Sequence, residues 1–229
     1  MDETRRIEKI TGSLFILATV SSSLGFILLD SVLDDTDVLG SVAANDTRVV
    51  VAALFLLVNA AAVVVIPALL FPVFNRHNGH LARLYPGARI IESAVLVIGV
   101  VGLLSLVTLS NEYEQGSPDA DSYRIAGDAL VAIYDWGALL GIMFFFALAG
   151  LLLNFLLLRY DLVPRWLAVW GLVGVALLLI EGALEAFDVD SFAIMSLPFA
   201  IQEMVFAFWL IAKGLTTSDP LPQPISEEV

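Results

Sequence analysis

Six long apolar stretches alternate with short polar segments along this chain of 229 residues. A helix needs roughly 20 mostly apolar residues to cross a hydrocarbon core about 30 Å thick. All of the stretches reach that length without a run of charged residues. They are Ile10–Leu29, Val49–Phe74, Arg89–Ser110, Trp136–Leu158, Trp166–Phe187 and Leu197–Leu215. The pattern predicts an all-α, polytopic membrane protein in which residues 1–215 form a single domain, a six-transmembrane-helix bundle.

Residues typical of loops and helix ends separate the apolar stretches. The segment 30–48 contains five aspartates, and the polar segment 75–87 ends in Pro86 and Gly87. Pro164 stands where a proline can open the next helix without losing a hydrogen bond. We therefore expect non-helical breaks at these places.

Two further segments follow weaker patterns. Asp128 and Asp135 are seven residues apart and share a helical face, so we expect Tyr123–Asp135 to be helical. Its charge places it outside the hydrocarbon, and we expect it to lie along the membrane interface. The last segment, 216–229, contains three prolines, and we expect it to be a disordered cytoplasmic tail.

The basic residues are distributed unequally between the two predicted sides of the membrane. One side carries nine of them, and the other carries only Arg48 and Arg124. The nine are Arg5, Arg6, Lys9, Arg76, Arg83, Arg89, Arg159, Arg165 and Lys213. Because cytoplasmic loops are enriched in lysine and arginine, we expect both termini in the cytoplasm. We expect a multi-pass protein of a prokaryotic plasma membrane, with a strongly acidic exterior face.

Composition narrows the class of protein further. Hydrophobic residues make up 59% and charged residues 15% of the chain, against about half and about a quarter in soluble domains. The net charge of −13 is the opposite of a nucleic-acid binder's basic footprint, so we expect no nucleic-acid partner. Acid-rich, lysine-poor loops favour a protein that works in high salt, as in a halophile. The absence of cysteine excludes disulfides and thiolate chemistry.

Ionisable side chains inside apolar stretches are the candidate functional residues, because lipid makes them costly. Glu203 and Glu181 are the deepest carboxylates. Glu92 follows Arg89 at a spacing that lets them form an ion pair. Each has a structural alternative. The Arg89–Glu92 pair is also typical of an interfacial helix anchor, and a neutral Glu203 hydrogen-bonded to a neighbouring helix is equally consistent with the sequence.

A combined acidic site is a further hypothesis. Glu181 and Glu185 are four residues apart on one helical face. Together with Glu203 and Asp135 they would form an outward-facing cavity that attracts monovalent cations or protons. The alternative is that Glu185 simply begins an outside loop.

The remaining polar residues favour structure over chemistry. Asn154 and Asn59, inside predicted helices, are typical of amides that bind helices together. His77 and His80 are three residues apart, but Gly79 between them argues against a shared helix, so we expect no metal site. No glycine-rich phosphate loop, zinc-protease motif or nucleophile elbow is present. We expect no catalytic residue and no cofactor.

Several segments together resemble one protein family. They are residues 10–19, 89–92, 162–171, 202–204 and 208–214. The chain is similar there to the membrane proteins grouped as domain of unknown function 4386. The resemblance implies a multi-helix bacterial or archaeal membrane protein and brings no established activity or ligand. Its polar positions coincide with Arg89, Glu92, Arg165 and Glu203.

Three functional hypotheses follow. The first is a non-enzymatic sensor, scaffold or partner subunit, and the second is a small ion- or proton-coupled transporter that uses intramembrane glutamates. The third is a lipid-modifying membrane enzyme, which would need a polar pocket open to lipid near the cytoplasmic arginines. We expect membrane lipid, a protein partner or a second copy of the chain as interaction partners.

Overall fold

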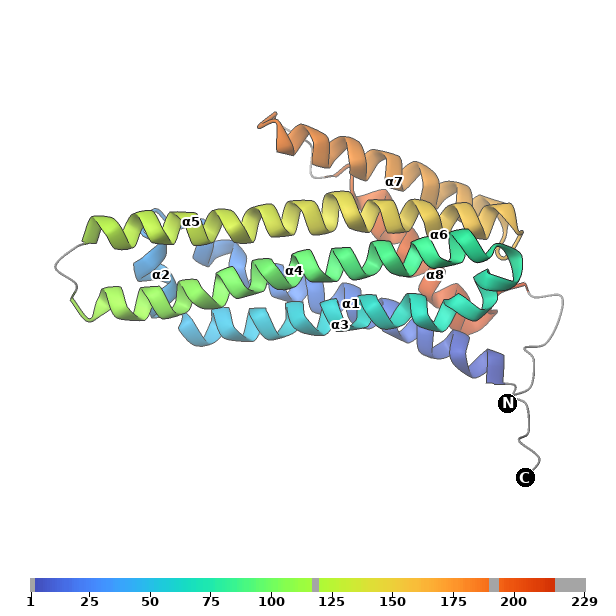
Figure 1. The fold of residues 1–229 in the computed structure, drawn as a ribbon, viewed down its shortest axis with the longest axis horizontal. Helices are drawn as coiled ribbons and strands as arrows, with labels where there is room; N and C mark the ends of the chain where they lie inside the picture. The colour runs from blue at the N-terminus through green and yellow to red at the C-terminus, as the bar shows by residue number, and fades with distance from the viewer. Residues whose placement is uncertain (1–2, 117–119, 190–193, 217–229) are drawn as a thin grey trace, which may run out of the picture.

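The computed structural model describes residues 3–116, 120–189 and 194–216, and this part of the chain is helical throughout, with short connections. Figure 1 shows the helices running lengthwise in one elongated bundle. Their bounds are α1 Glu3–Leu33, α2 Val38–Ala44, α3 Asp46–His77, α4 Gly79–Glu114, α5 Ala120–Ala138, η1 Leu139–Phe146, α6 Ala147–Arg159, α7 Arg165–Ala186 and α8 Leu197–Ala212.

Five of these helices are long and apolar enough to span a membrane. They are α1, α3, α4, the continuous helix Ala120–Arg159 and α7, and α8 is a shorter apolar helix. The chain is therefore an all-α, multi-pass membrane protein. The start of α1, the turn between α3 and α4 and the connection from α6 to α7 lie at one end of the bundle, whereas α2 and the start of α5 lie at the other (Figure 1).

The polar segment 75–87 is not the break that the sequence predicted. Only Asn78 separates α3 from α4, so Pro86 and Gly87 lie inside α4. The Asn78 side chain accepts hydrogen bonds from the backbone N–H groups of His80 and Leu81, each at 3.1 Å. This cap satisfies donors of the first helical turn and lets α4 begin ten residues before the predicted start at Arg89. Pro86 removes one backbone donor and leaves the helix continuous.

The interface helix expected at Tyr123–Asp135 is also different. The segment is helical, as predicted, but α5 continues through η1 into α6 as one helix instead of lying along the membrane. It packs against α4 at Gly137, where an added Cβ would lie 3.0 Å from the Cα of Gly99. The close approach of two glycines holds this segment along α4.

The two longest continuous helices, α4 and Ala120–Arg159, are longer than the hydrocarbon core of a bilayer is thick. At about 1.5 Å per residue, the 36 residues of α4 measure about 54 Å. The segment 30–48, predicted as a break, contains the short helix α2, which buries Leu39 and Val42 against the neighbouring helices. Because a hydrocarbon core is about 30 Å thick, part of α4 must lie outside it.

The opposite end of the bundle is closed by apolar packing and by a polar clamp. Phe15, Phe74, Tyr85 and Phe206 are fully buried there. Arg5 of α1 donates to the last carbonyls of α8, Leu210 O and Ile211 O, at 2.7 Å each. The expected disordered tail, 216–229, lies outside the described residues except for Thr216, whose backbone N–H donates to Leu162 O at 2.8 Å.

Candidate functional site

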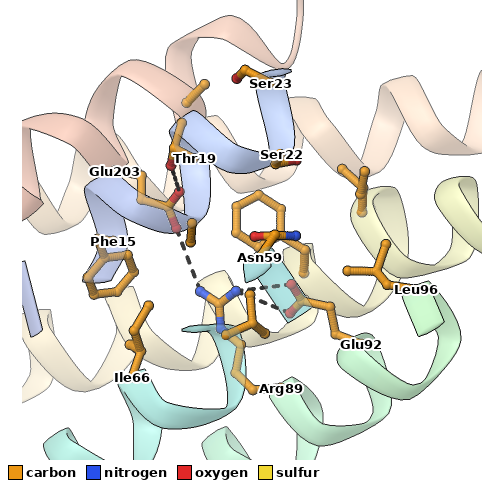
Figure 2. A pocket seen from close by; sticks show the side chains of 15 residues that line it. Phe15, Thr19, Ser22, Ser23, Asn59, Ile66, Arg89, Glu92, Leu96 and Glu203 are labelled. Atoms are coloured by element: carbon orange, nitrogen blue, oxygen red, sulfur yellow. Dashed lines mark hydrogen bonds and ion pairs between the residues drawn. The ribbon is translucent and has the colours of Figure 1, made fainter. Parts of the chain in front are cut away.

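A buried ion cluster lies in the interior of the bundle, with Arg89 at its centre. Arg89 is 2% exposed, and its Nη1 donates to both carboxylate oxygens of Glu92 at 3.2 and 3.1 Å. Its Nη2 lies 3.6 Å from Oε1 of Glu203, on α8 (Figure 2). The guanidinium therefore joins α4 to α8, and the predicted Arg89–Glu92 pair is formed in the protein interior.

A third helix completes the cluster. Thr19 of α1 donates from its hydroxyl to Oε2 of Glu203 at 3.3 Å. With both carboxyl groups ionised, the two glutamates and one arginine carry a net charge of −1. Isolated charge is expensive in an apolar interior unless it is paired or neutralised. In that charge state, a proton or a small cation would balance the remaining negative charge.

Aromatic rings surround the guanidinium. The Arg89 Cζ lies 5.7 Å from the ring centroid of Tyr85 and 5.0 Å from that of Phe146. Such contacts stabilise a cation by roughly 1 kcal/mol or more when desolvated. Within the described chain, Arg89 Nε and the Tyr85 hydroxyl have no hydrogen-bond partner. Arg89 is therefore held by the two carboxyl groups and the two aromatic rings, and its Nε–H remains available as a hydrogen-bond donor.

The ion cluster borders a narrow cavity of about 120 Å³. Besides the charged groups, polar side chains line it, namely Thr19, Ser22, Ser23 and Asn59 (Figure 2). A water molecule occupies about 30 Å³ in the liquid, so the cavity has room for a few waters or one small ion with part of its hydration shell.

A wider cavity of about 660 Å³ adjoins the narrow one. The two share the wall residues Ser22, Ile142, Phe146 and Ala200. Asp135 of α5 and Glu185 of α7 also line the wide cavity. These residues place it towards the end of the bundle where α7 ends and α8 begins.

The predicted acidic residues are thus divided between different environments. Glu203 and Glu92 line the narrow cavity with Arg89, whereas Asp135 and Glu185 line the wide one. Glu181 lines neither of these two cavities. It is 3% exposed, and its Oε2 has no hydrogen-bond partner among the described residues. The structure therefore separates the four residues that the sequence suggested as one acidic site.

Residues that the sequence analysis did not single out also contribute to the site. Tyr85 precedes Arg89 by one helical turn, a local signal that was available in the sequence. Thr19 and Phe146 come from α1 and η1 and carry no such signal. The η1 segment is a π-helix, a form that often marks functional sites in longer helices. Its Ile142 and Phe146 face both cavities.

Polar contacts beside the cluster hold α8 in place. Gln202 donates from Nε2 to Asn154 Oδ1 at 3.1 Å and to Leu167 O at 3.2 Å. These bonds join α8 to α6 and α7, which fits the packing role predicted for Asn154. Gln202 directly precedes Glu203, so the same bonds help to hold this part of α8 in place. His77 and His80 belong to α3 and α4, and His77 stacks on Tyr160 with ring centroids 4.7 Å apart.

Comparison with known proteins gives one match. The sequence model of a family described as Domain of unknown function (DUF4386) matches residues 10–214. No curated protein and no solved structure matches the chain. The matched region contains every residue of the ion cluster and both cavities.

Proposed function

Since the chain belongs to the DUF4386 family of membrane proteins, we propose that it is a small transporter coupled to protons or monovalent cations. Arg89, Glu92 and Glu203 form its central binding site. With the lysine- and arginine-rich end in the cytoplasm, both termini face inward and the wide cavity faces outward. The protein would act in the plasma membrane of a prokaryote.

The observation that carries this proposal is the composition of the ion cluster at the narrow cavity. Two carboxylates share one guanidinium, and all three groups are buried. A purely structural ion pair needs one carboxylate for one guanidinium. The additional carboxylate faces a cavity that four uncharged polar side chains also line, and this arrangement suits a cation or proton site.

Access to the site from one end supports transport. The narrow cavity shares a wall with the wide cavity towards one end of the bundle. Towards the other end lie the fully buried rings of Phe15, Phe74 and Tyr85. A transporter alternates between states in which its site is open to one side only, and in the proposed mechanism the present arrangement is the outward-facing state.

A sensor or partner subunit is the second candidate, favoured by the same buried site. Such a protein would bind the ion and change shape without moving it across the membrane. Ion binding alone therefore does not separate the two functions, and a flux measurement does.

The test uses purified protein reconstituted into liposomes that contain a pH-sensitive dye. Imposed gradients of protons, Na⁺ and K⁺ would be applied to wild type, Glu203→Gln and the matched control Glu112→Gln, an exposed position near the end of α4. We expect flux in wild type and control and a loss of about tenfold or more in Glu203→Gln, equal to about 1.4 kcal/mol.

A thermal-stability measurement on the same proteins separates the outcomes. A cation present at about 100 times its dissociation constant should stabilise the folded state by about 2.7 kcal/mol. If a cation stabilises wild type but no ion flux is measured, the protein is a sensor and not a transporter. Equal flux in wild type and Glu203→Gln would contradict the proposed site.

A further inference from the structure

We propose that the wide cavity is a binding site for lipophilic organic cations, molecules that combine a positive charge with an apolar, preferably aromatic, body. This inference names a substrate class for the transporter and rests on the function proposed above. It is carried by a different set of residues, so the two can fail separately.

The size of the cavity suits a small organic molecule. Its volume is about 660 Å³, and binding sites for small molecules typically measure about 300–1,000 Å³. The narrow cavity, at about 120 Å³, lies below that range. The two compartments therefore differ in what they can hold.

The charge of the wide cavity selects a cation. Asp135 of α5 and Glu185 of α7 contribute two carboxylates from two different helices, and no lysine or arginine is among its lining residues. Both side chains are exposed, so a ligand in the cavity can reach them. An anionic guest would be repelled by two like charges, and a neutral acyl chain would gain nothing from them.

The remaining wall selects an apolar and aromatic body. The wall contains four aromatic rings, from Phe26, Tyr134, Phe146 and Phe199, and Met143 contributes an adaptable thioether. Ring faces attract cations, most strongly where water is excluded. Carboxylates combined with aromatic faces thus match an ammonium or phosphonium centre carrying hydrophobic groups.

The shared wall would couple the two compartments. Phe146 lies between them, because it lines both cavities and its ring contacts Arg89 at 5.0 Å. An organic cation in the wide cavity would repel a proton or metal cation bound at Glu203 through a low-dielectric region. Mutual exclusion of this kind is what exchange of one cation for another requires.

The experiment measures binding of tetraphenylphosphonium to the purified full-length protein in an uncharged detergent, by equilibrium dialysis. Tetraphenylborate, which has the same shape and the opposite charge, is the matched control ligand. The variants are Asp135→Asn, Glu185→Gln, their double variant and Ala138→Trp, which places an indole in the cavity. Glu112→Gln is again the control protein.

We expect saturable binding of tetraphenylphosphonium and none of tetraphenylborate. Each single carboxylate variant should weaken binding by about tenfold and the double variant by more, where tenfold corresponds to about 1.4 kcal/mol. Ala138→Trp should remove binding, and Glu112→Gln should keep it. Circular dichroism and thermal unfolding would verify that every variant is folded.

Three results would overturn the inference. The first is the absence of saturable tetraphenylphosphonium binding. The second is equally strong binding of tetraphenylborate, which would indicate a groove that binds any lipophilic ion. The third is phosphonium binding that neither carboxylate variant changes. If phosphonium binding is absent while Glu203-dependent ion flux persists, only this inference fails. If binding is found but no ion flux occurs, the proposed transport function fails instead.

Discussion

Arg89 Nη2 lies 3.6 Å from Glu203 Oε1, and this contact between α4 and α8 brings two carboxylates to one buried guanidinium. Glu92 is the other carboxylate, one helical turn from Arg89 on α4. The cluster thus ties two helices together and at the same time contains one more carboxyl group than it has cations. Stability and ion binding should therefore respond to the same residues.

Removal of Arg89 should be strongly destabilising. Arg89→Gln leaves Glu92 and Glu203 buried without a counter-ion, and loss of one partner from a buried ion pair typically costs about 3–5 kcal/mol. Addition of Glu203→Gln to that variant should restore part of the loss, because it removes one uncompensated charge. Unfolding in detergent followed by circular dichroism measures both effects in a double-mutant cycle. Arg165→Gln, at an exposed ion pair, is the control and should leave stability unchanged.

Thr19 should act through the position of Glu203. Thr19→Val keeps the side-chain shape but removes the hydroxyl that donates to Glu203 Oε2. We expect a loss of cation-induced thermal stabilisation with little change in the stability of the ion-free protein, because one modest hydrogen bond is worth only about 1 kcal/mol. Thr19→Ser keeps the donor and should behave as wild type. A Thr19→Val protein that binds ions normally would show that this contact has no role in binding.

The close packing of α4 against α5 should leave no room for a side chain at Gly137. Gly137→Val would force the helices apart, since even a Cβ there lies 3.0 Å from Gly99 Cα. Overpacking of this kind typically costs about 1–3 kcal/mol. Gly87→Ala is the matched control, because no atom lies within 4 Å of its added Cβ. That change should be neutral or stabilising by up to about 1 kcal/mol, through helix propensity. Thermal unfolding measures both effects: the melting temperature should fall in Gly137→Val and should stay the same or rise in Gly87→Ala.

The contacts of Arg5 and Glu8 with the end of α8 should limit local unfolding of that helix end. Arg5 binds two α8 carbonyls, and Glu8 pairs with Arg5 at 2.9 Å while accepting from the Leu215 N–H at 2.8 Å. Arg5→Ala should cost about 1–2 kcal/mol, since it removes charge-assisted hydrogen bonds. Hydrogen exchange at residues 210–215 should accelerate while exchange in α4 stays constant. Uniform acceleration in both helices would mean global destabilisation instead.

Salt should stabilise the protein if the acidic composition is an adaptation to high ionic strength. The net charge of −13 produces self-repulsion that ions screen, with a Debye length of about 10 Å at 0.1 M and about 3 Å at 1 M. We expect the melting temperature to rise between these concentrations of KCl. An unchanged melting temperature would show that the acidic composition is not an adaptation to high salt.

The sequence by itself determined the features that depend on local periodicity. Long apolar stretches predict helices wherever they occur, because lipid leaves the backbone no other way to satisfy its hydrogen bonds. The pairing of Arg89 with Glu92 follows in the same way from their spacing on one helix. The family resemblance rested on local motifs too, and the family match over residues 10–214 confirms it.

Only the tertiary structure decided how the helices are rotated and packed against one another. It placed Thr19 and Glu203 beside Arg89 and excluded Glu181 from that cluster. It also continued α4 through Pro86 and created the wide cavity beside η1. These results depend on side-chain fit between helices distant in sequence. A pattern of apolar positions specifies that a helix is buried, and it leaves open which neighbour each polar side chain will meet.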